Sequence, residues 1–178
     1  LASRALWWLA IGWQRGGQLR ISQNQNGFEG MTVQREESGE RRVRTQEMLD
    51  KWLLERQQML VLYCQLAGLE PYTPDKPIKK LLREFCQVMV DYIAFGHFEV
   101  YDRISRGDER RTRVLQIAEE VYPKVAAAAD LAIAFNDKYE SGIQDPPLDY
   151  LDRDLSELGV ELASRIEMED RVVNASLG

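Results

Sequence analysis

Histidine is nearly absent from this chain of 178 residues, in which only His97 occurs. Di-iron sites in helical bundles use two Glu-x-x-His pairs, so a single histidine excludes a ferritin-like or hemerythrin-like centre of the usual kind. Cysteine is almost as rare, and Cys64 and Cys86 do not form a CxxC pair. A structural zinc site draws its four ligands from such residues. We therefore expect no metal and no other cofactor.

The two cysteines each lie within an apolar helical pattern. The simplest interpretation is that both are small buried hydrophobic residues in a reducing compartment, which predicts a cytoplasmic protein. A disulfide between helices stays open at this point, because its geometry cannot be judged from sequence.

Long hydrophobic runs are also missing, since no stretch reaches the roughly 20 apolar residues that span a bilayer. The nearest candidate is residues 6–13, LWWLAIGW, which is short and lacks a small-residue cleavage site. An interfacial anchor remains an alternative, but we expect no membrane partner. The chain begins with Leu1, and a polar, glycine-containing stretch precedes Met31. We expect Met31 to be the natural start and residues 1–43 to be a disordered extension.

Motifs of common enzyme classes are absent as well: the sequence contains no P-loop, no GxGxxG and no GxSxG. Neighbouring acids such as Asp152 with Asp154 and Glu169 with Asp170 resemble acid/base pairs. On amphipathic helices such pairs are far more often solvated surface. We therefore expect a protein without catalytic residues.

Negative charge exceeds positive charge, and the formal net charge is −6. Because phosphate binding needs a clearly basic surface, direct nucleic-acid binding is disfavoured. The charge is uneven: residues 140–170 carry ten acids and two arginines, a net −8, whereas residues 103–113 carry a net +3. The acidic segment indicates either a solvated helix face or a surface for a basic partner.

Apolar residues recur at three- and four-residue steps in four regions, and no region alternates with period two for long enough to be a strand. We predict helices over about residues 45–67, from about residue 77 to residue 106, from about residue 115 to residue 139, and from Asp149 onward. Gly68 is the expected end of the first helix. These helices predict an all-α, up-and-down four-helix bundle formed by residues 44–178 as one domain.

Two positions are expected to interrupt the second and third helices. Gly96 weakens the second pattern, which is then one long helix with a bend or two abutting helices. Pro123 should kink the third helix or begin a new one. The predicted bundle therefore has a kinked or broken second and third helix.

The segment of residues 85–101, FCQVMVDYIAFGHFEVY, resembles the signature of the Rsd/AlgQ family of anti-sigma factors. Two flanking blocks agree: KWLLERQQML at residues 51–60, and LGVELASRIEMED at residues 158–170, with Arg165 in place. The resemblance covers about residues 45–173. The sequence departs from the pattern at Ala94 and Phe95, where smaller residues are expected, and at Val160, where the family tends to have an acid.

The resemblance implies that the protein binds the primary, sigma-70-type factor of bacterial RNA polymerase, mainly through the C-terminal domain that reads promoter DNA. It would thereby sequester that factor and regulate transcription. The matching motifs imply a set of sigma-binding residues. These are Asp91, Phe95, His97, Phe98, Tyr101 and Asp102, and more weakly Trp52, Arg56, Glu169 and Asp170. Trp52, Tyr92 and Phe85 are better suited to the core, and Phe98 and Tyr101 suit core or interface equally.

Two other interpretations remain open. A helical bundle with one histidine could be a histidine phosphotransfer domain using His97, although Glu99 and Asp102 would repel a phosphoryl group. Alternatively, the bundle has a partner unrelated to transcription. Further signalling proteins could also be partners, as they are for some relatives.

Overall fold

The computed structural model describes residues 29–69, 71–72, 74–106, 109, 111–139 and 148–177. The regular elements within these ranges are all helices, with no strand among them, which confirms the all-α prediction. The chain divides into two units, Leu1–Met48 and Leu49–Gly178. The second unit contains the bundle.

Helix α2 spans Glu29–Leu66 and begins 16 residues before the predicted start near Thr45. Residues 29–43, which sequence analysis expected to belong to a disordered extension, form the first part of α2, and residues 1–28 lie outside the described part. No proline occurs between residues 29 and 66. Pairs such as Glu40 and Arg44, 3.3 Å apart at i,i+4 spacing, stabilise an exposed helix.

The end of α2 confirms the prediction at Gly68, which has a positive φ of 64°. The amide of Leu69 donates to the carbonyl of Cys64, and the amide of Gly68 donates to that of Gln65. This is the hydrogen-bond pattern of a Schellman motif, which needs a left-handed residue at this position. Gly68 supplies that conformation without steric cost.

The second stretch is a continuous helical rod with a change of winding. Helix α3 spans Ile78–Phe95, a π-helix, η1, follows at Gly96–Tyr101, and α4 continues over Asp102–Ser105. Sequence analysis placed an interruption at Gly96 but did not predict π-helical winding. The backbone of Gly96 itself stays helical, with φ −57° and ψ −43°.

The third and fourth stretches are α5, Thr112–Tyr139, and α6, Leu151–Leu177. Pro123 lies inside α5 and does not divide it into two helices. Buried Val121 and Val125 on either side of the proline anchor this part of α5 in the core. A short 3₁₀ turn, η2, spans Leu148–Tyr150, so Asp149 lies in this turn and α6 begins after it.

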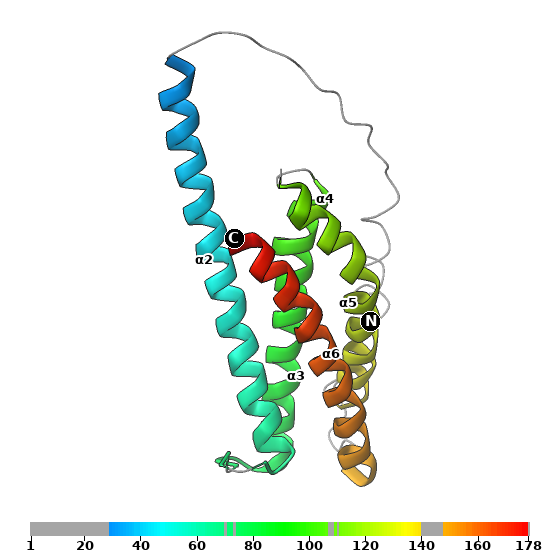
Figure 1. The fold of residues 1–178 in the computed structure, drawn as a ribbon. Coiled ribbons are helices and arrows are strands. Elements are labelled where there is room, and N and C mark those ends of the chain that lie inside the picture. Colours follow the sequence, from blue (N-terminus) through cyan, green and yellow to red (C-terminus); the bar gives the residue numbers. More distant parts are fainter. Residues whose placement is uncertain are drawn as a thin grey trace. The chain divides into compact units, whose positions relative to one another are not determined.

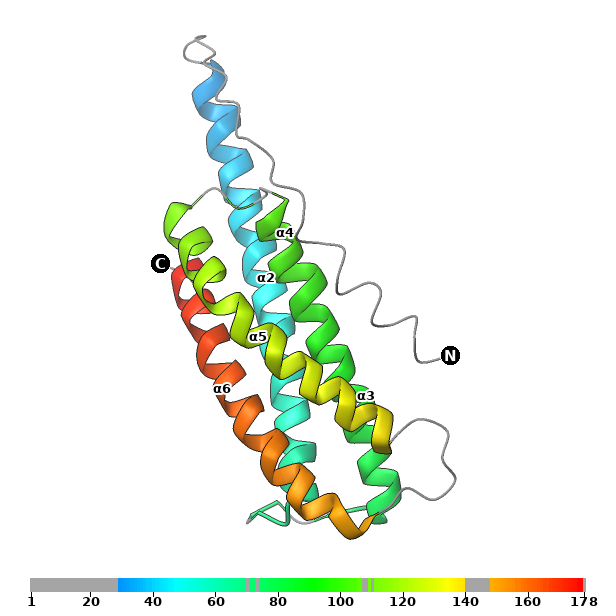
Figure 2. The same ribbon diagram turned by 90° about the vertical axis from the view of Figure 1, so that its right-hand side faces the viewer.

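Within Leu49–Gly178, the helices α2, α3, α5 and α6 run alternately in opposite directions (Figures 1 and 2), as an up-and-down bundle does. Helix α5 packs against α3 and, more extensively, against α6. The alanines Ala128, Ala129 and Ala132 of α5 are buried, which lets a neighbouring helix approach closely. The core also contains the largest fully buried apolar side chains: Trp52, Tyr92, Phe85, Leu49, Met59, Leu81, Leu82, Met89 and Leu158.

Candidate functional site

The signature segment occupies the C-terminal part of α3 and all of η1, and its two faces have different roles. Phe85, Met89 and Tyr92 are fully buried, which confirms that the aromatic residues of the first half belong to the core. Asp91 is exposed, and Phe98 keeps 45% of its surface exposed. The same helical segment therefore supplies core packing on one face and reachable charged and aromatic groups on the other.

The first residue of η1 makes a close approach to α2. At Gly96, an added Cβ atom would lie 2.8 Å from Nε1 of Trp52 and 2.9 Å from its Cζ2. A glycine is therefore required if the indole of α2 is to lie against the backbone of the second rod. The amide of Asp102 then donates to the carbonyl of His97, five residues back. Such π-helical turns are uncommon and are found frequently at functional sites.

Trp52 and Tyr101 lie at the centre of an aromatic cluster rather than on the surface. The Trp52 ring stacks on Tyr92 with 6.3 Å between centroids and meets Tyr101 edge-on at the same distance. Tyr101 in turn meets Tyr122 at 5.5 Å. Trp52 is fully buried and Tyr101 is 5% exposed. In this conformation neither predicted contact residue is open to a partner.

His97 is half-buried between two aromatic rings. Its ring centroid lies 5.1 Å from that of Phe98, and its Nδ1 is 3.4 Å from the hydroxyl oxygen of Tyr122. Burial, and then the positive charge of Arg165, lower the pKa of His97. The imidazole is therefore neutral at pH 7, as expected for a ring packed among aromatic side chains.

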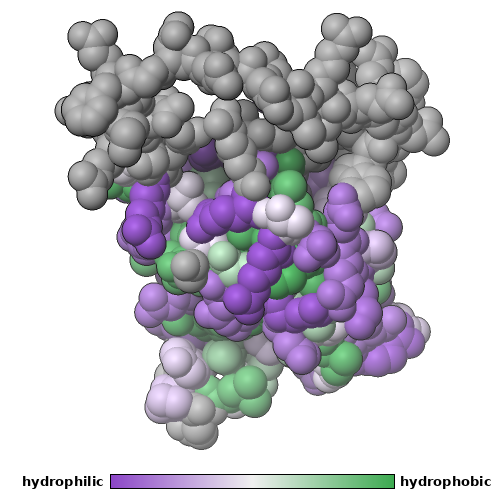
Figure 3. Space-filling view, turned by 45° about the horizontal axis from the view of Figure 1, so that its top comes forward, coloured by the Kyte–Doolittle hydropathy of each residue, from purple (hydrophilic) through white to green (hydrophobic). Residues whose placement is uncertain are grey.

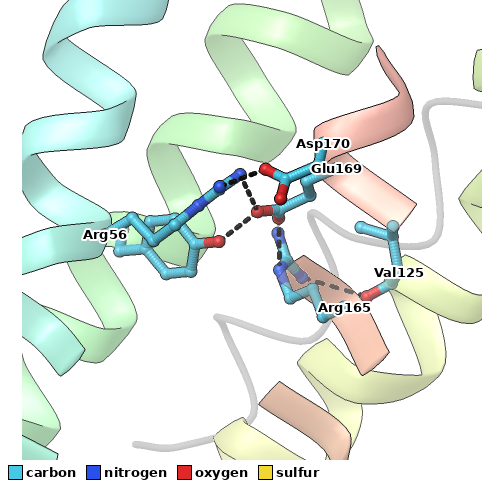
Figure 4. Close-up of polar contacts among 6 residues, drawn as sticks. Arg56, Val125, Arg165, Glu169 and Asp170 are labelled. Atoms are coloured by element: carbon cyan, nitrogen blue, oxygen red, sulfur yellow. Dashed lines mark hydrogen bonds and ion pairs between the residues drawn. The ribbon is translucent and has the colours of Figure 1, made fainter. Parts of the chain in front are cut away.

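A cluster of ionic side chains joins α2, α3 and α6 behind this aromatic layer (Figure 4). Glu169 is completely buried and accepts from Arg56 at 3.1 Å and from Nε of Arg165 at 2.6 Å. The hydroxyl of Tyr92 also donates to Glu169, and Arg56 reaches the half-exposed Asp170. We call Arg56, Tyr92, Arg165, Glu169 and Asp170 the buried ion cluster.

The helix α5 is tied to the same cluster through its backbone. Arg165 is 1% exposed and donates from Nη1 to the carbonyl of Val125 at 3.0 Å. That bond connects α5 to the ionic network, as Figure 4 shows. A buried charge is tolerated only when paired and hydrogen-bonded, and both conditions hold for Arg165 and Glu169.

The electrostatics keep Tyr92 and Arg165 of this cluster protonated. Burial raises the pKa of Tyr92, and the negative charge of Glu169 raises it further, so its hydroxyl remains a donor. Burial lowers the pKa of Arg165, but Glu169, Tyr92 and Tyr101 together raise it by more, and the net pKa lies above the ordinary value. Tyr92 and Arg165 therefore both keep the protons that they donate to Glu169.

The interpretation of neighbouring acids as solvated surface is wrong for Glu169 and holds for Asp170. Glu169 is 0% exposed and Asp170 is 52% exposed, although they are adjacent in sequence. The i,i+4 spacing of Arg165 and Glu169 on α6 was the available signal. Sequence analysis quoted Arg165 but assigned it no role.

Two of the reachable predicted residues, Asp91 and Phe95, lie next to side chains of α2. Phe95 is half-buried beneath Lys51 of α2, whose Nζ lies 4.6 Å from the ring centroid. Glu55, one turn further along α2, is close enough to Asp91 for the Asp91 charge to act on it. Asp102 pairs with Arg106 at 2.6 Å. We call Lys51, Glu55, Asp91 and Phe95 the α2–α3 face; sequence analysis did not single out its Lys51 and Glu55.

Helix α6 contributes one close contact that sequence analysis also missed. The hydroxyl of Tyr63 donates to the backbone carbonyl of Leu155 at 3.0 Å. A Cβ atom at Gly159 would lie 2.7 Å from Cζ of Tyr63 and closer still to its hydroxyl. Gly159 is therefore required for this contact between α2 and α6.

Figure 3 shows one side of the molecule, on which hydrophilic residues predominate among those described, with smaller hydrophobic areas between them. None of the described helices is both long and apolar enough to cross a membrane. Among the residues with a described placement, no group of three or more His, Cys, Asp or Glu side chains is arranged to hold a metal ion.

The fold and the site define a helical bundle with a face of charged and aromatic side chains next to a buried ion cluster. The family model described as "Regulator of RNA polymerase sigma(70) subunit, Rsd/AlgQ" matches residues 31–176. The chain therefore belongs to the Rsd/AlgQ family, which confirms the resemblance found in its sequence.

Curated relatives agree with this assignment. The chain is 33% identical over 133 residues to "Regulator of sigma D" of Yersinia enterocolitica, covering 71% of this chain and 78% of that protein. It is 35% identical over 134 residues to the protein of that name from Enterobacter sp. (strain 638), covering 73% and 80%. No solved structure gives a significant match. The family is one of transcription regulators, and the phosphotransfer interpretation of His97 receives no support from it.

Proposed function

We propose that this protein is an anti-sigma factor that binds the primary sigma factor of bacterial RNA polymerase and sequesters it. The observation that supports this most strongly is membership of the family described as regulators of the RNA polymerase sigma(70) subunit. The expected target is the C-terminal, promoter-reading domain, whose DNA-binding surface is basic. An acidic protein with net charge −6 would attract such a surface and compete with DNA for it.

We assign the contacts to the reachable part of the predicted set. Asp91, Phe95, Phe98, Asp102 and Asp170 keep exposed surface, and Phe98 is the aromatic residue among them that exposes most. A few aromatic anchors usually supply most of the affinity of an interface, while charges mainly speed the encounter. Trp52, Tyr101, Arg56 and Glu169 would instead act from the interior, by holding the α2–α3 face in place. His97, packed against Phe98, would orient that anchor.

The test is calorimetric titration of the full-length protein against the isolated C-terminal domain of the primary sigma factor at two salt concentrations. We expect saturable one-to-one binding that weakens as salt screens the opposite charges. Absence of binding at tens of micromolar, with both proteins folded, would refute the proposal.

A pair of matched variants locates the interface. Phe98→Ala should weaken binding about tenfold or more, as loss of an aromatic anchor does. Tyr72→Ala is the control, because Tyr72 is 42% exposed and lies in the connection between α2 and α3. Equal affinities for the two variants would exclude Phe98 as an anchor.

A further inference from the structure

Lys51 places a positive charge on an aromatic ring at the α2–α3 face. Its Nζ lies 4.6 Å from the centroid of the Phe95 ring and 3.9 Å from Oε1 of Glu55. Lys51 and Glu55 thus form an ion pair, but the distance between them is too long for a hydrogen bond. The Lys51 side chain is 62% exposed. Moving its ammonium away from the Phe95 ring therefore costs little free energy.

Glu55 is not satisfied by this lysine. Its side chain is 23% exposed, and its Oε2 atom is buried with no hydrogen-bond partner among the described residues. Burial raises the pKa of Glu55; Lys51 lowers it and the charge of Asp91 raises it. Glu55 therefore has one distant ammonium and a neighbouring negative charge, and one of its oxygens still lacks a donor. A buried acceptor without a donor is costly, so a better-placed cation would be favoured here.

We propose that Phe95, Glu55 and Asp91 form a binding site for an arginine side chain of the partner, and that Lys51 occupies this site until the partner displaces it. This inference rests on the proposed function, because it names the chemical group by which a basic partner is recognised. A guanidinium is planar and weakly hydrated, so it can stack on the Phe95 ring. Its several N–H donors can bond to the accessible oxygen of Glu55 and to the exposed Asp91 together, which an ammonium 3.9 Å from Glu55 does not do.

Phe95 makes the site a feature of this particular chain. A smaller residue was expected at this position from the sequence pattern, and a small side chain would offer no ring face to a cation. The structure instead gives Phe95 a half-buried ring that a cation already contacts. Lys51 and Glu55, one turn apart on α2, complete the arrangement.

The first test removes the resident cation from the full-length protein. Lys51→Met should bind the sigma C-terminal domain about two- to fivefold more tightly than wild type, the range that an exposed cation–π contact accounts for. Lys124→Met is the matched control, because Lys124 is an exposed lysine of α5 and its loss changes the net charge equally. If Lys51→Met binds no more tightly than Lys124→Met, the arginine site is wrong.

Two further variants change the residues that would bind the partner's arginine. Glu55→Gln and Phe95→Leu should each weaken binding severalfold, and Lys51→Met should no longer improve binding in the Phe95→Leu background. Thermal unfolding of every variant shows that the fold is kept. If Lys51→Met still tightens binding by the same factor in the Phe95→Leu background, the gain does not come from freeing the Phe95 ring, and the proposed displacement is contradicted.

A partner-independent measurement separates this inference from the proposed function. The Phe95 ring should shift the NMR signals of the Lys51 ε-methylene protons upfield, and a hexa-arginine peptide should return them toward solvent values. If the sigma domain does not bind but hexa-arginine displaces Lys51, the proposed function fails and the arginine site stands. If neither ligand moves the Lys51 signals, the arginine site fails.

Discussion

Two carboxylates on α6 have nearly the same contacts in different surroundings. Each accepts hydrogen bonds from two cationic side chains and one tyrosine hydroxyl. The donors to Glu169 are Arg56, Arg165 and Tyr92. The donors to Asp154 are Lys138, Arg153 and Tyr139. The Glu169 side chain and its two arginines are at most 9% exposed. Asp154 is 13% exposed, but its cations are 35% and 71% exposed.

The comparison shows that a list of contacts does not give their energetic weight. Charges in the interior interact in a low effective dielectric and cannot be replaced by water, so losing one partner leaves the others stranded. Charges at the surface are screened, and water replaces a lost partner cheaply. We therefore expect Glu169 to decide whether the bundle folds and Asp154 to adjust its stability slightly.

The largest effect should come from Glu169→Gln. This change leaves Arg56 and Arg165 buried without their shared carboxylate, and removing one member of a buried pair costs about 3–5 kcal/mol. Urea unfolding followed by circular dichroism measures the loss of unfolding free energy. A loss below about 1 kcal/mol would place Glu169 in the same class as Asp154 and break the comparison.

A triple variant serves as the control for Glu169. Replacing Arg56 and Arg165 by Met together with Glu169→Leu removes all three buried charges at once. Apolar replacements of whole buried ion groups are often neutral or stabilising. The triple variant should therefore be more stable than Glu169→Gln, and the reverse order would show that the penalty does not arise from stranded charge.

The next largest effect should come from Gly159→Ala, at a position on α6 between the two clusters. The new methyl group would collide with the ring and hydroxyl of Tyr63, and overpacking of this kind costs about 1–3 kcal/mol. Thermal unfolding measures the change. Since Tyr63→Phe removes the atom closest to the new methyl, the double variant should recover part of the loss. Equal stability of Gly159→Ala and wild type would mean that Tyr63 can move away freely.

Asp154→Asn should have a smaller effect, about 1 kcal/mol or less, because surface ion pairs contribute little. Its cost should shrink further in high salt, whereas the cost of Glu169→Gln should change little. Urea unfolding of both variants at low and high salt measures this difference. Equal salt dependence of the two variants would contradict the assignment of one cluster to the surface.

The smallest effect is a pH dependence at the same residue. Hydrogen bonds from Lys138, followed by those from Tyr139 and Arg153, lower the pKa of Asp154 from 3.8 to about 2. A carboxyl whose pKa is depressed in the folded state contributes stability above its unfolded value and loses it as pH falls. The stability difference between wild type and Asp154→Asn should therefore be constant above pH 4 and diminish between pH 4 and pH 2. A difference that stays constant down to pH 2 would contradict the low pKa.

Much of this architecture is readable from local patterns. The apolar periodicity predicted the four helical stretches, Gly68 predicted the end of α2, and Phe85 and Tyr92 were correctly placed in the core. These features depend on neighbours within a few residues, which sequence reasoning can see. The start of α2 was missed, because a charged stretch without apolar periodicity was taken for disorder.

The candidate site was harder to predict because its members come from separate helices. The signature segment located Asp91, Phe95 and Phe98, whose exposure suits a binding face. It did not indicate that Trp52 would press against Gly96, or that Lys51 and Glu55 of α2 would lie beside Phe95 and Asp91. Those relations depend on the register between α2 and α3.

By itself, the sequence determined that the chain is helical, which stretches are amphipathic, and which family it belongs to, because periodicity and rare residues at fixed offsets are local properties. Only the tertiary structure decided that Glu169 is buried while Asp170 is not, and that the turn at Gly96 winds as a π-helix. The physical reason is that burial and close approach depend on where a neighbouring helix lies. Two acids that are neighbours in the same stretch of sequence can therefore contribute very differently to stability once α2 and α5 pack against α6.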